Sequence, residues 1–239
     1  MTEDRDIRIF LIRHGESEAN LDKSINRRIA DHRVSLSSHG HEQAASAGNF
    51  LYEYLTQHPG SGRLRLWQSP YLRTKQTARA IIDAMPHLIT DTRESIFLRE
   101  IEFGIFDGVP DLELLKLFPH EYAHYQKCKA FEGEIYARMP GGESRIDVCQ
   151  RVHQFFGTIQ RDAVRHGIDN IIVVSHGVTV RCFAMMWCNH TVEWLEAERN
   201  PANCSIRLLK GGEDCGLIYT GITDTPAGQQ EEREDGRID

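Results

Sequence analysis

The stretch at 171–175, IIVVS, constrains the fold of this 239-residue chain more than any other. It is a nearly unbroken run of β-branched residues, which is typical of a strand buried on both faces of a sheet. Such strands belong to parallel sheets whose two faces are covered by helices. A helix beginning at His176-Gly177 and running to about 188 is expected next. The sequence therefore predicts a central strand of an α/β fold.

Strands and helices alternate along most of the remaining chain. Strands are predicted at 7–12, 63–67 and 95–98, and a late hairpin is predicted from 204–209 and 216–220 around Gly211-Gly212. Helices are predicted at 38–57, 71–85 and 143–166. This alternation predicts a three-layer α/β/α sandwich around a mostly parallel sheet.

Two segments depart from the alternation. Residues 105–140 contain three prolines, several aromatic residues and a predicted helix at 111–117, which indicates a small helical cap insertion. From Thr223 onward the chain holds six acids and two arginines with almost no apolar residue, a composition typical of disorder. We predict a single α/β domain over 1–222, a cap at 105–140 within it, and a disordered acidic tail over 223–239.

Composition narrows the functional class. The formal net charge is -7, and no basic stripe with interleaved aromatic residues is present, so a nucleic-acid partner is not expected. None of the six cysteines forms a CxxC pair, which favours reduced thiols in an intracellular protein. The first apolar run is too short for a signal peptide or a membrane span. We expect a cytoplasmic protein that does not engage membranes.

Polar side chains follow three of the predicted strands at the points where the strands end. Arg13 and His14 follow the first, Arg73 lies shortly after the second, and His176 and Gly177 follow the IIVVS strand. Ligands of open α/β sheets bind outside the carboxyl ends of the strands, and helix N-termini there favour anions. Two guanidinium groups and two imidazoles at this edge predict a phosphate pocket.

A complete set of groups for phosphoryl transfer can be named from these positions. His14 would be the nucleophile, and Glu100, which follows the 95–98 segment, would be the general acid that protonates a leaving alkoxide. Glu102 lies close enough in sequence to be mistaken for it. Because arginine supplies the positive charge, we expect no metal and no cofactor.

Six segments, in this order, resemble the histidine phosphatase superfamily, which includes the cofactor-dependent phosphoglycerate mutases. They are LIRHGESEAN at 11–20, LSSHGHEQA at 36–44, SPYLRTKQTA at 69–78, LREIEFG at 98–104, MPGGES at 139–144 and VVSHG at 173–177. Any one of these segments is weak evidence, but the ordered set is specific.

The resemblance implies a role for each matching residue. His14 would carry the phosphoryl group, while Arg13, Arg73 and His176 would hold its oxygens. Glu100 would act as general acid and base. Asn20 and the segment around Asn26 would contact the substrate or its phosphate.

The remaining alternatives concern the substrate and the fate of the phosphoryl group. Arg27, Arg28 and Arg33 form a basic cluster in the first loop, which is either solvated or a second anion contact. Mutases of this family carry extra basic residues, including an arginine pair, in the insertion. Here the 105–140 segment has four basic and six acidic residues and no arginine pair. We therefore expect hydrolysis of a phosphomonoester, in the first place a small molecule, with mutase activity as the alternative and an inactive binding protein as a less favoured one. A sugar phosphate, a small acid phosphate, a nucleotide and a phosphoprotein all stay open as the substrate, and so does the oligomeric state.

Overall fold

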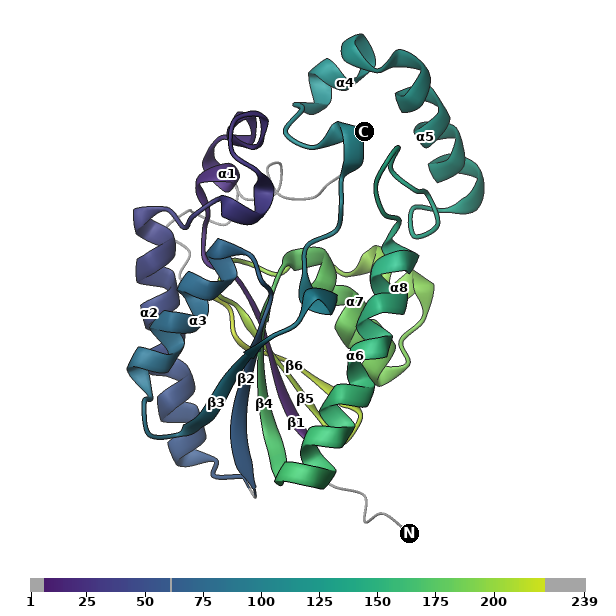
Figure 1. The fold of residues 1–239 in the computed structure, drawn as a ribbon. Helices are drawn as coiled ribbons and strands as arrows, with labels where there is room; N and C mark the ends of the chain where they lie inside the picture. The colour runs from purple at the N-terminus through teal and green to yellow at the C-terminus, as the bar shows by residue number, and fades with distance from the viewer. Residues whose placement is uncertain (1–6, 61, 222–239) are drawn as a thin grey trace.

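The computed structural model of the chain describes residues 7–60 and 62–221. The acidic tail predicted at 223–239 lies outside the described residues. Within them, the α/β sandwich expected from the sequence is confirmed. A six-stranded sheet lies between two layers of helices, and a helical cap lies above one end of the strands (Figure 1).

The sheet has the strand order β3-β2-β4-β1-β5-β6. Four neighbouring strands run parallel, and β5 is antiparallel to both of its neighbours. The strands are β1 (Arg8–Arg13), β2 (Arg63–Gln68), β3 (Ile89–Glu94), β4 (Ile168–Ser175), β5 (Ile206–Lys210) and β6 (Glu213–Tyr219). The IIVVS segment belongs to β4, which is buried along its whole length, as predicted.

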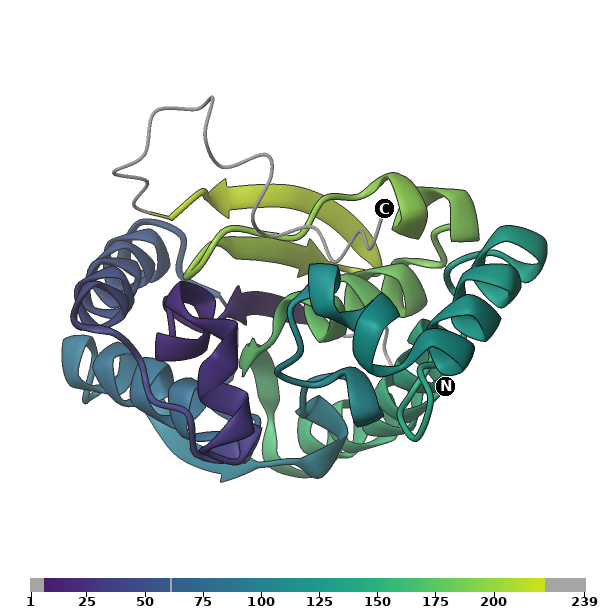
Figure 2. The same ribbon diagram turned by 90° about the horizontal axis from the view of Figure 1, so that it is seen from above.

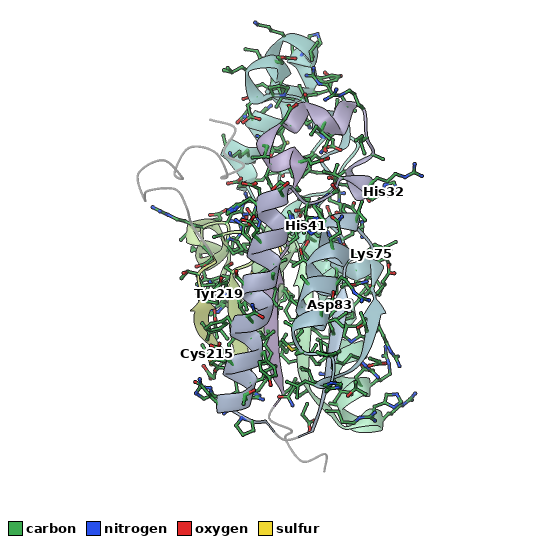
Figure 3. All side chains as sticks on the ribbon, turned by 90° about the vertical axis from the view of Figure 1, so that its left-hand side faces the viewer. His32, His41, Lys75, Asp83, Cys215 and Tyr219 are labelled. Atoms are coloured by element: carbon green, nitrogen blue, oxygen red, sulfur yellow. The ribbon has the colours of Figure 1, made fainter. Side chains whose placement is uncertain are left out.

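Alternate residues of the central strands face two separate cores, because side chains in a strand point to opposite faces. On one face, Phe10 and Ile12 of β1 pack with α2 (Ser38–Gln57) and α3 (Leu72–Ala84). Figure 3 looks onto these two helices, which run side by side over the sheet. On the other face, Ile9 and Leu11 pack with α6 (Arg145–His166) and α7 (Gly177–Cys188).

The cap lies above the carboxyl ends of the parallel strands. It contains α4 (Asp111–Leu117) and α5 (Pro119–Glu132), which enclose a small core around Phe106, Leu114 and Tyr125. A first loop with α1 (Glu18–Leu21) and the short 3-10 helices Lys23–Arg27 and Asp31–Arg33 lies beside it, as the purple and teal segments in Figure 2 show. A further short helix, α8 (Val192–Ala197), follows α7.

One predicted strand is wrong. The 95–98 segment does not extend the sheet; Ile96–Leu98 forms a 3-10 helix, and the strand is the preceding β3. β3 is an edge strand of sequence ITDTRE whose residues are mostly exposed, so it lacks the apolar pattern of a buried strand. In the part of the chain that the structure describes, no helix has both the length and the apolar composition needed to cross a bilayer.

Candidate active site

His14 lies directly after the carboxyl end of β1 and is 3% exposed. Its backbone N–H donates to the carbonyl oxygen of Ser175 at 2.9 Å, which extends the pairing of β1 with β4. Its ring Nδ1 lies 2.7 Å from the carbonyl oxygen of Gly15. Since a carbonyl only accepts hydrogen bonds, Nδ1 carries the proton, and Nε2 presents a lone pair to the site.

A loop before β5 holds the backbone and side chain of this strand end. Arg13 donates from Nη1 to the carbonyl oxygen of Pro201 at 2.7 Å. Asn203 donates to the carbonyl of His14 at 2.9 Å, and the N–H of Cys204 donates to the carbonyl of Arg13 at 3.0 Å. These contacts fix Arg13 and His14 relative to the sheet, and nothing in the sequence pattern of residues 200–204 indicated them.

Arg73 lies in the first turn of α3, is 5% exposed, and faces His14. Its Nε is 3.3 Å from Nε2 of His14. Its Nη1 and Nη2 donate to the carboxylate of Asp31 at 2.8 and 3.2 Å. Asp31 was not among the predicted site residues, yet it holds the outer edge of the guanidinium so that Nε remains directed at His14.

His176 and Glu100 complete the cluster. The ring of the fully buried His176 lies 5.2 Å from that of His14, and its Nε2 is 2.8 Å from the hydroxyl of Ser69. Its Nδ1 lies 3.7 Å from the Glu100 carboxylate. Polar atoms of His14, His176 and Glu100 all lie within 4.8 Å of one another, so one phosphoryl ester can contact all three.

Burial and positive charge set the protonation of the cluster. Burial, and after it the charges of Arg73 and Arg13, lowers the pKa of His14 well below its ordinary value. Burial and Arg73 lower the pKa of His176 in the same way. Burial raises the pKa of Glu100, although Arg73 opposes the shift. The surroundings therefore shift His14 toward its neutral form and Glu100 toward its protonated form, relative to the free side chains.

Buried side chains fix the segment that carries Glu100. The four consecutive backbone carbonyls of residues 97–100 each accept a side-chain hydrogen bond. Arg151 donates to the first and the last, at 2.6 and 3.1 Å, and the hydroxyls of Ser175 and Thr179 donate to the two middle ones, each at 2.8 Å. Arg151 also pairs with the buried Glu143 at 3.0 Å. Glu143, from the MPGGES segment, thus supports the Glu100 segment.

The Arg151→Met variant is expected to lower the free energy of unfolding by about 3 kcal/mol, because it leaves two carbonyls and part of a buried carboxylate without donors. Urea denaturation measures this loss. The matched control is Arg161→Met, on the exposed side of the same helix, which is expected to change stability by no more than about 0.5 kcal/mol. Equal losses in the two variants would contradict the role assigned to Arg151.

Residues of the LSSHGHEQA segment hold the loop that follows His14 through hydrogen bonds to Glu16. Ser37 donates to the carboxylate of Glu16 at 2.6 Å, and the side chain of Gln43 accepts from the N–H of Glu16 at 2.8 Å. A Cβ on Gly15 would lie 2.4 Å from the carbonyl oxygen of Gly40, so the two backbones meet at a distance that only glycine allows. This segment holds the loop in place and contributes no reactive group.

A cavity of about 250 Å³ extends from His14 to the inner wall of the cap. Asn20, Asn26 and Gly177 line it, as do the cluster residues Arg13, Arg73 and Glu100. The side-chain oxygen of Asn20 accepts from the N–H of Ser17 at 2.9 Å, which leaves its amide nitrogen available to the cavity.

Arg27 does not line this cavity. It donates to the carbonyl oxygen of Gly108 at 2.9 Å and to the carboxylate of Glu113 at 2.8 Å. Beside it, Asn26 donates to Asp107 at 2.8 Å. These three contacts tie the first loop to the cap, so the structure places Arg27 at the junction of loop and cap and away from His14.

His14, His176 and Glu100 are also a conceivable set of metal ligands, because their donor atoms are close together. The surrounding charges argue against a cation. The Nε–H of Arg73 already points at Nε2 of His14, and Arg13 lines the same cavity. Two guanidinium groups at this distance favour an anion over a metal ion.

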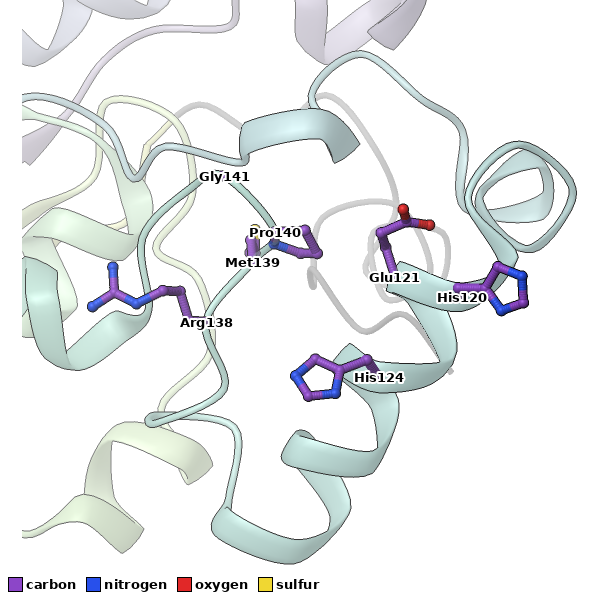
Figure 4. A pocket seen from close by; sticks show the side chains of 7 residues that line it. All are labelled: His120, Glu121, His124, Arg138, Met139, Pro140 and Gly141. Carbon is purple, nitrogen blue, oxygen red and sulfur yellow. The ribbon is translucent and has the colours of Figure 1, made fainter.

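The expectation of a metal-free protein assumes that no His-Glu-x-x-His spacing occurs, which is wrong, because residues 120–124 carry one. In α5 these residues border a second, shallow pocket in the cap (Figure 4). The rings of His120 and His124 point in different directions there, and His120 points away from the pocket. Within 7–60 and 62–221, no group of three potential ligands other than the His14 cluster gathers, so this spacing does not build a metal site.

Comparison with known proteins identifies the family. A model of the histidine phosphatase superfamily (branch 1) matches residues 9–220, which is most of the chain. The chain belongs to this superfamily. The family membership confirms the resemblance seen in the sequence and supports phosphoryl transfer of the phosphatase or mutase type.

Relatives of this histidine phosphatase carry several names. Phosphoglycerate mutase-like proteins AT74 and AT74H of Arabidopsis thaliana are 34% and 31% identical to it; each alignment covers 86% of this chain and, respectively, 65% and 74% of the relative. A 6-phosphofructo-2-kinase/fructose-2,6-bisphosphatase of Aquarana catesbeiana is 30% identical over 90% of this chain and 40% of its own. The chain thus spans less than two thirds of two of these three relatives.

Solved structures confirm the fold of the chain. The alpha-ribazole phosphatase of Shigella flexneri superposes with a TM-score of 0.67 at 20% identity, covering 90% of this chain and 96% of its own. A mycobacterial glucosyl-3-phosphoglycerate phosphatase superposes with a TM-score of 0.64 at 20% identity, covering 92% of this chain and all of its own.

Proposed function

We propose that this histidine phosphatase hydrolyses phosphomonoesters without a metal ion, through a phosphohistidine formed on His14, with Glu100 as general acid and base. The observation that carries the proposal is the geometry around Nε2 of His14. Its lone pair faces the cavity, Arg73 Nε lies 3.3 Å away, and Glu100 lies within 4.8 Å. A nucleophile, a phosphate-binding cation and a proton donor are thus in reach of one ester.

In the first step, the lone pair on Nε2 of His14 attacks phosphorus. The bond from phosphorus to the ester oxygen breaks, and the protonated Glu100 gives its proton to that oxygen as it leaves. Arg13, Arg73, His176 and the N–H groups at the start of α7 near Gly177 stabilise the negative charge on the equatorial oxygens. The product of this step is a phosphohistidine beside an ionised Glu100.

In the second step, the ionised Glu100 takes a proton from water, and the water oxygen attacks phosphorus. The bond between phosphorus and nitrogen breaks, and its electron pair returns to Nε2 of His14. Inorganic phosphate leaves, and Glu100 is again protonated for the next cycle. Each atom and proton is accounted for with the residues already in the site.

The proposal is tested by measuring phosphate release from a panel of phosphomonoesters in the presence of a chelator. The panel includes 3-phosphoglycerate, with 2-phosphoglycerate followed in parallel. Release that survives the chelator supports metal-free hydrolysis, and loss of release in chelator contradicts it. Interconversion of the two phosphoglycerates without release would show the mutase alternative, and the absence of both reactions across the panel would favour a binding role.

The location of the protein is part of the same proposal. All six cysteines are free thiols in the structure, and three of them are buried. This supports a reducing compartment, and we propose the cytoplasm.

A further inference from the structure

The charged residues that line the cavity outside the His14 cluster, here called the cavity wall, carry equal numbers of acids and bases. Besides Arg13 and Arg73, three basic side chains line it: Lys23, Arg145 and Arg181. Besides Asp31 and Glu100, three acids line it: Asp107, Asp111 and Glu134. The part of the cavity that would receive the leaving group is therefore neutral in formal charge.

Each basic group on this wall contacts another part of the protein, and Arg145 makes the closest and most buried ion pair of the three. Arg145 Nη2 lies 2.6 Å from the carboxylate of Glu134, and both side chains are largely buried. Lys23 Nζ lies 3.9 Å from Asp111. Arg181 donates from Nη1 to the backbone carbonyl of Glu198 at 2.8 Å. At Arg145, a second anion on the substrate would have to displace Glu134, and it would also meet the carboxylates of Asp107 and Asp111.

The same wall offers good partners for uncharged groups. Phe106, Leu114 and Tyr125 are buried in the core of the cap and also line the cavity. Carboxylates such as Asp107 accept hydrogen bonds from hydroxyl groups, and the apolar side chains pack against carbon atoms. In Figure 2 the cap that supplies this wall lies beside the first loop, and the contacts of Asn26 and Arg27 hold the two together.

We infer that the substrate carries one phosphoryl group on an uncharged leaving group with hydroxyl and apolar parts, and that the Glu134–Arg145 pair is the element that rejects a second anion. This inference rests on the proposed function and specifies its substrate class. It distinguishes the chain from an enzyme for bisphosphates or for carboxylated phosphate esters, because those substrates need a cation that is not already paired.

The test compares two ligands that differ at one group. Glycerol 3-phosphate has a hydroxymethyl group where 3-phosphoglycerate has a carboxylate. Each is measured as a competitor of p-nitrophenyl phosphate hydrolysis, so that slow turnover of either one does not hide its binding. The wild-type protein is expected to bind glycerol 3-phosphate about tenfold more tightly, since the carboxylate of 3-phosphoglycerate would lie beside Asp107 and Asp111 while Arg145 is already paired with Glu134.

The Glu134→Gln variant releases Arg145 and is expected to move the ratio of the two inhibition constants about tenfold toward 3-phosphoglycerate. The control is Glu113→Gln, which frees Arg27 outside the cavity and is expected to leave the ratio unchanged. Tighter binding of 3-phosphoglycerate by the wild type would overturn the inference, and so would a ratio of inhibition constants that Glu134→Gln does not change. In either case, hydrolysis of p-nitrophenyl phosphate would still support the proposed function. Failure to hydrolyse p-nitrophenyl phosphate or any other ester would overturn the proposed function, and the inference with it.

Discussion

The His14→Ala variant is expected to lose phosphate release, with a fall in kcat of about 10⁴-fold or more. Nε2 of His14 is the nucleophile in the proposed cycle, and no neighbouring group can replace it. His176 is fully buried, and its Nε2 is engaged with Ser69 at 2.8 Å. Removal of His14 therefore removes the first step, while Arg13 and Arg73 can still bind phosphate.

The measurement is steady-state phosphate release, with circular dichroism to show that the variant is folded. His41→Ala is the matched control, because His41 is an exposed histidine at the start of α2 (Figure 3). It is expected to retain wild-type activity. Substantial phosphate release by a folded His14→Ala protein would mean that another group, or water itself, attacks the ester.

The Glu100→Gln variant is expected to separate substrates by leaving group. For an alkyl ester such as glycerol 3-phosphate, kcat/KM is expected to fall by about 10²- to 10³-fold, because the leaving alkoxide needs the proton. For p-nitrophenyl phosphate, whose leaving group is stable as an anion, the fall is expected to be less than about tenfold. The ratio kcat/KM is the useful quantity, since it reports the step in which the ester bond breaks.

The same variant has a pH signature. In the wild type, kcat/KM for an alkyl ester is expected to fall as the pH rises through the raised pKa of Glu100, because the ionised carboxylate has no proton to give. On the acid side, the lowered pKa of His14 keeps the nucleophile unprotonated below the ordinary histidine range. Glu100→Gln is expected to abolish the alkaline limb.

The control for this pair of measurements is Glu102→Gln, which removes the neighbouring acid that pairs with Arg99 and does not line the cavity. It is expected to leave both the leaving-group ratio and the pH profile as in the wild type. Equal slowing of both esters by Glu100→Gln would move the acid role to another residue.

The central part of the fold and the convergence of the cluster could be predicted because they follow from local rules. Parallel strands end at one edge of a sheet, so residues that come directly after such strands meet there. The register pairs Arg13 with Ser175, so His14 and His176 lie directly after the ends of neighbouring strands. Arg73 lies in the first turn of the helix that follows β2, and β2 also neighbours β4.

The contacts that fix these residues could not be predicted in the same way. Asp31 is one of many acids in polar loops, and only the folded first loop brings it to Arg73. Asn203 lies 189 residues from His14 in sequence, and no periodicity links the two. The charge of Arg27 suggests an anion contact in the sequence, but in the structure Arg27 pairs with Glu113 in the cap. In each of these three examples, the partner of the site residue depends on the conformation of a loop, and that conformation depends on tertiary packing.

Rapid-quench labelling of the protein with a ³²P-labelled phosphomonoester during turnover tests the phosphohistidine most directly. We expect label on His14 of the wild-type protein within the first turnover, stable in alkali and lost in acid, as is usual for a phosphohistidine. We also expect the label to be discharged to water as inorganic phosphate and His14→Ala to carry none. An acid-stable label, a label that persists in His14→Ala, or turnover without any protein-bound phosphate at short times would rule out a phosphohistidine on His14.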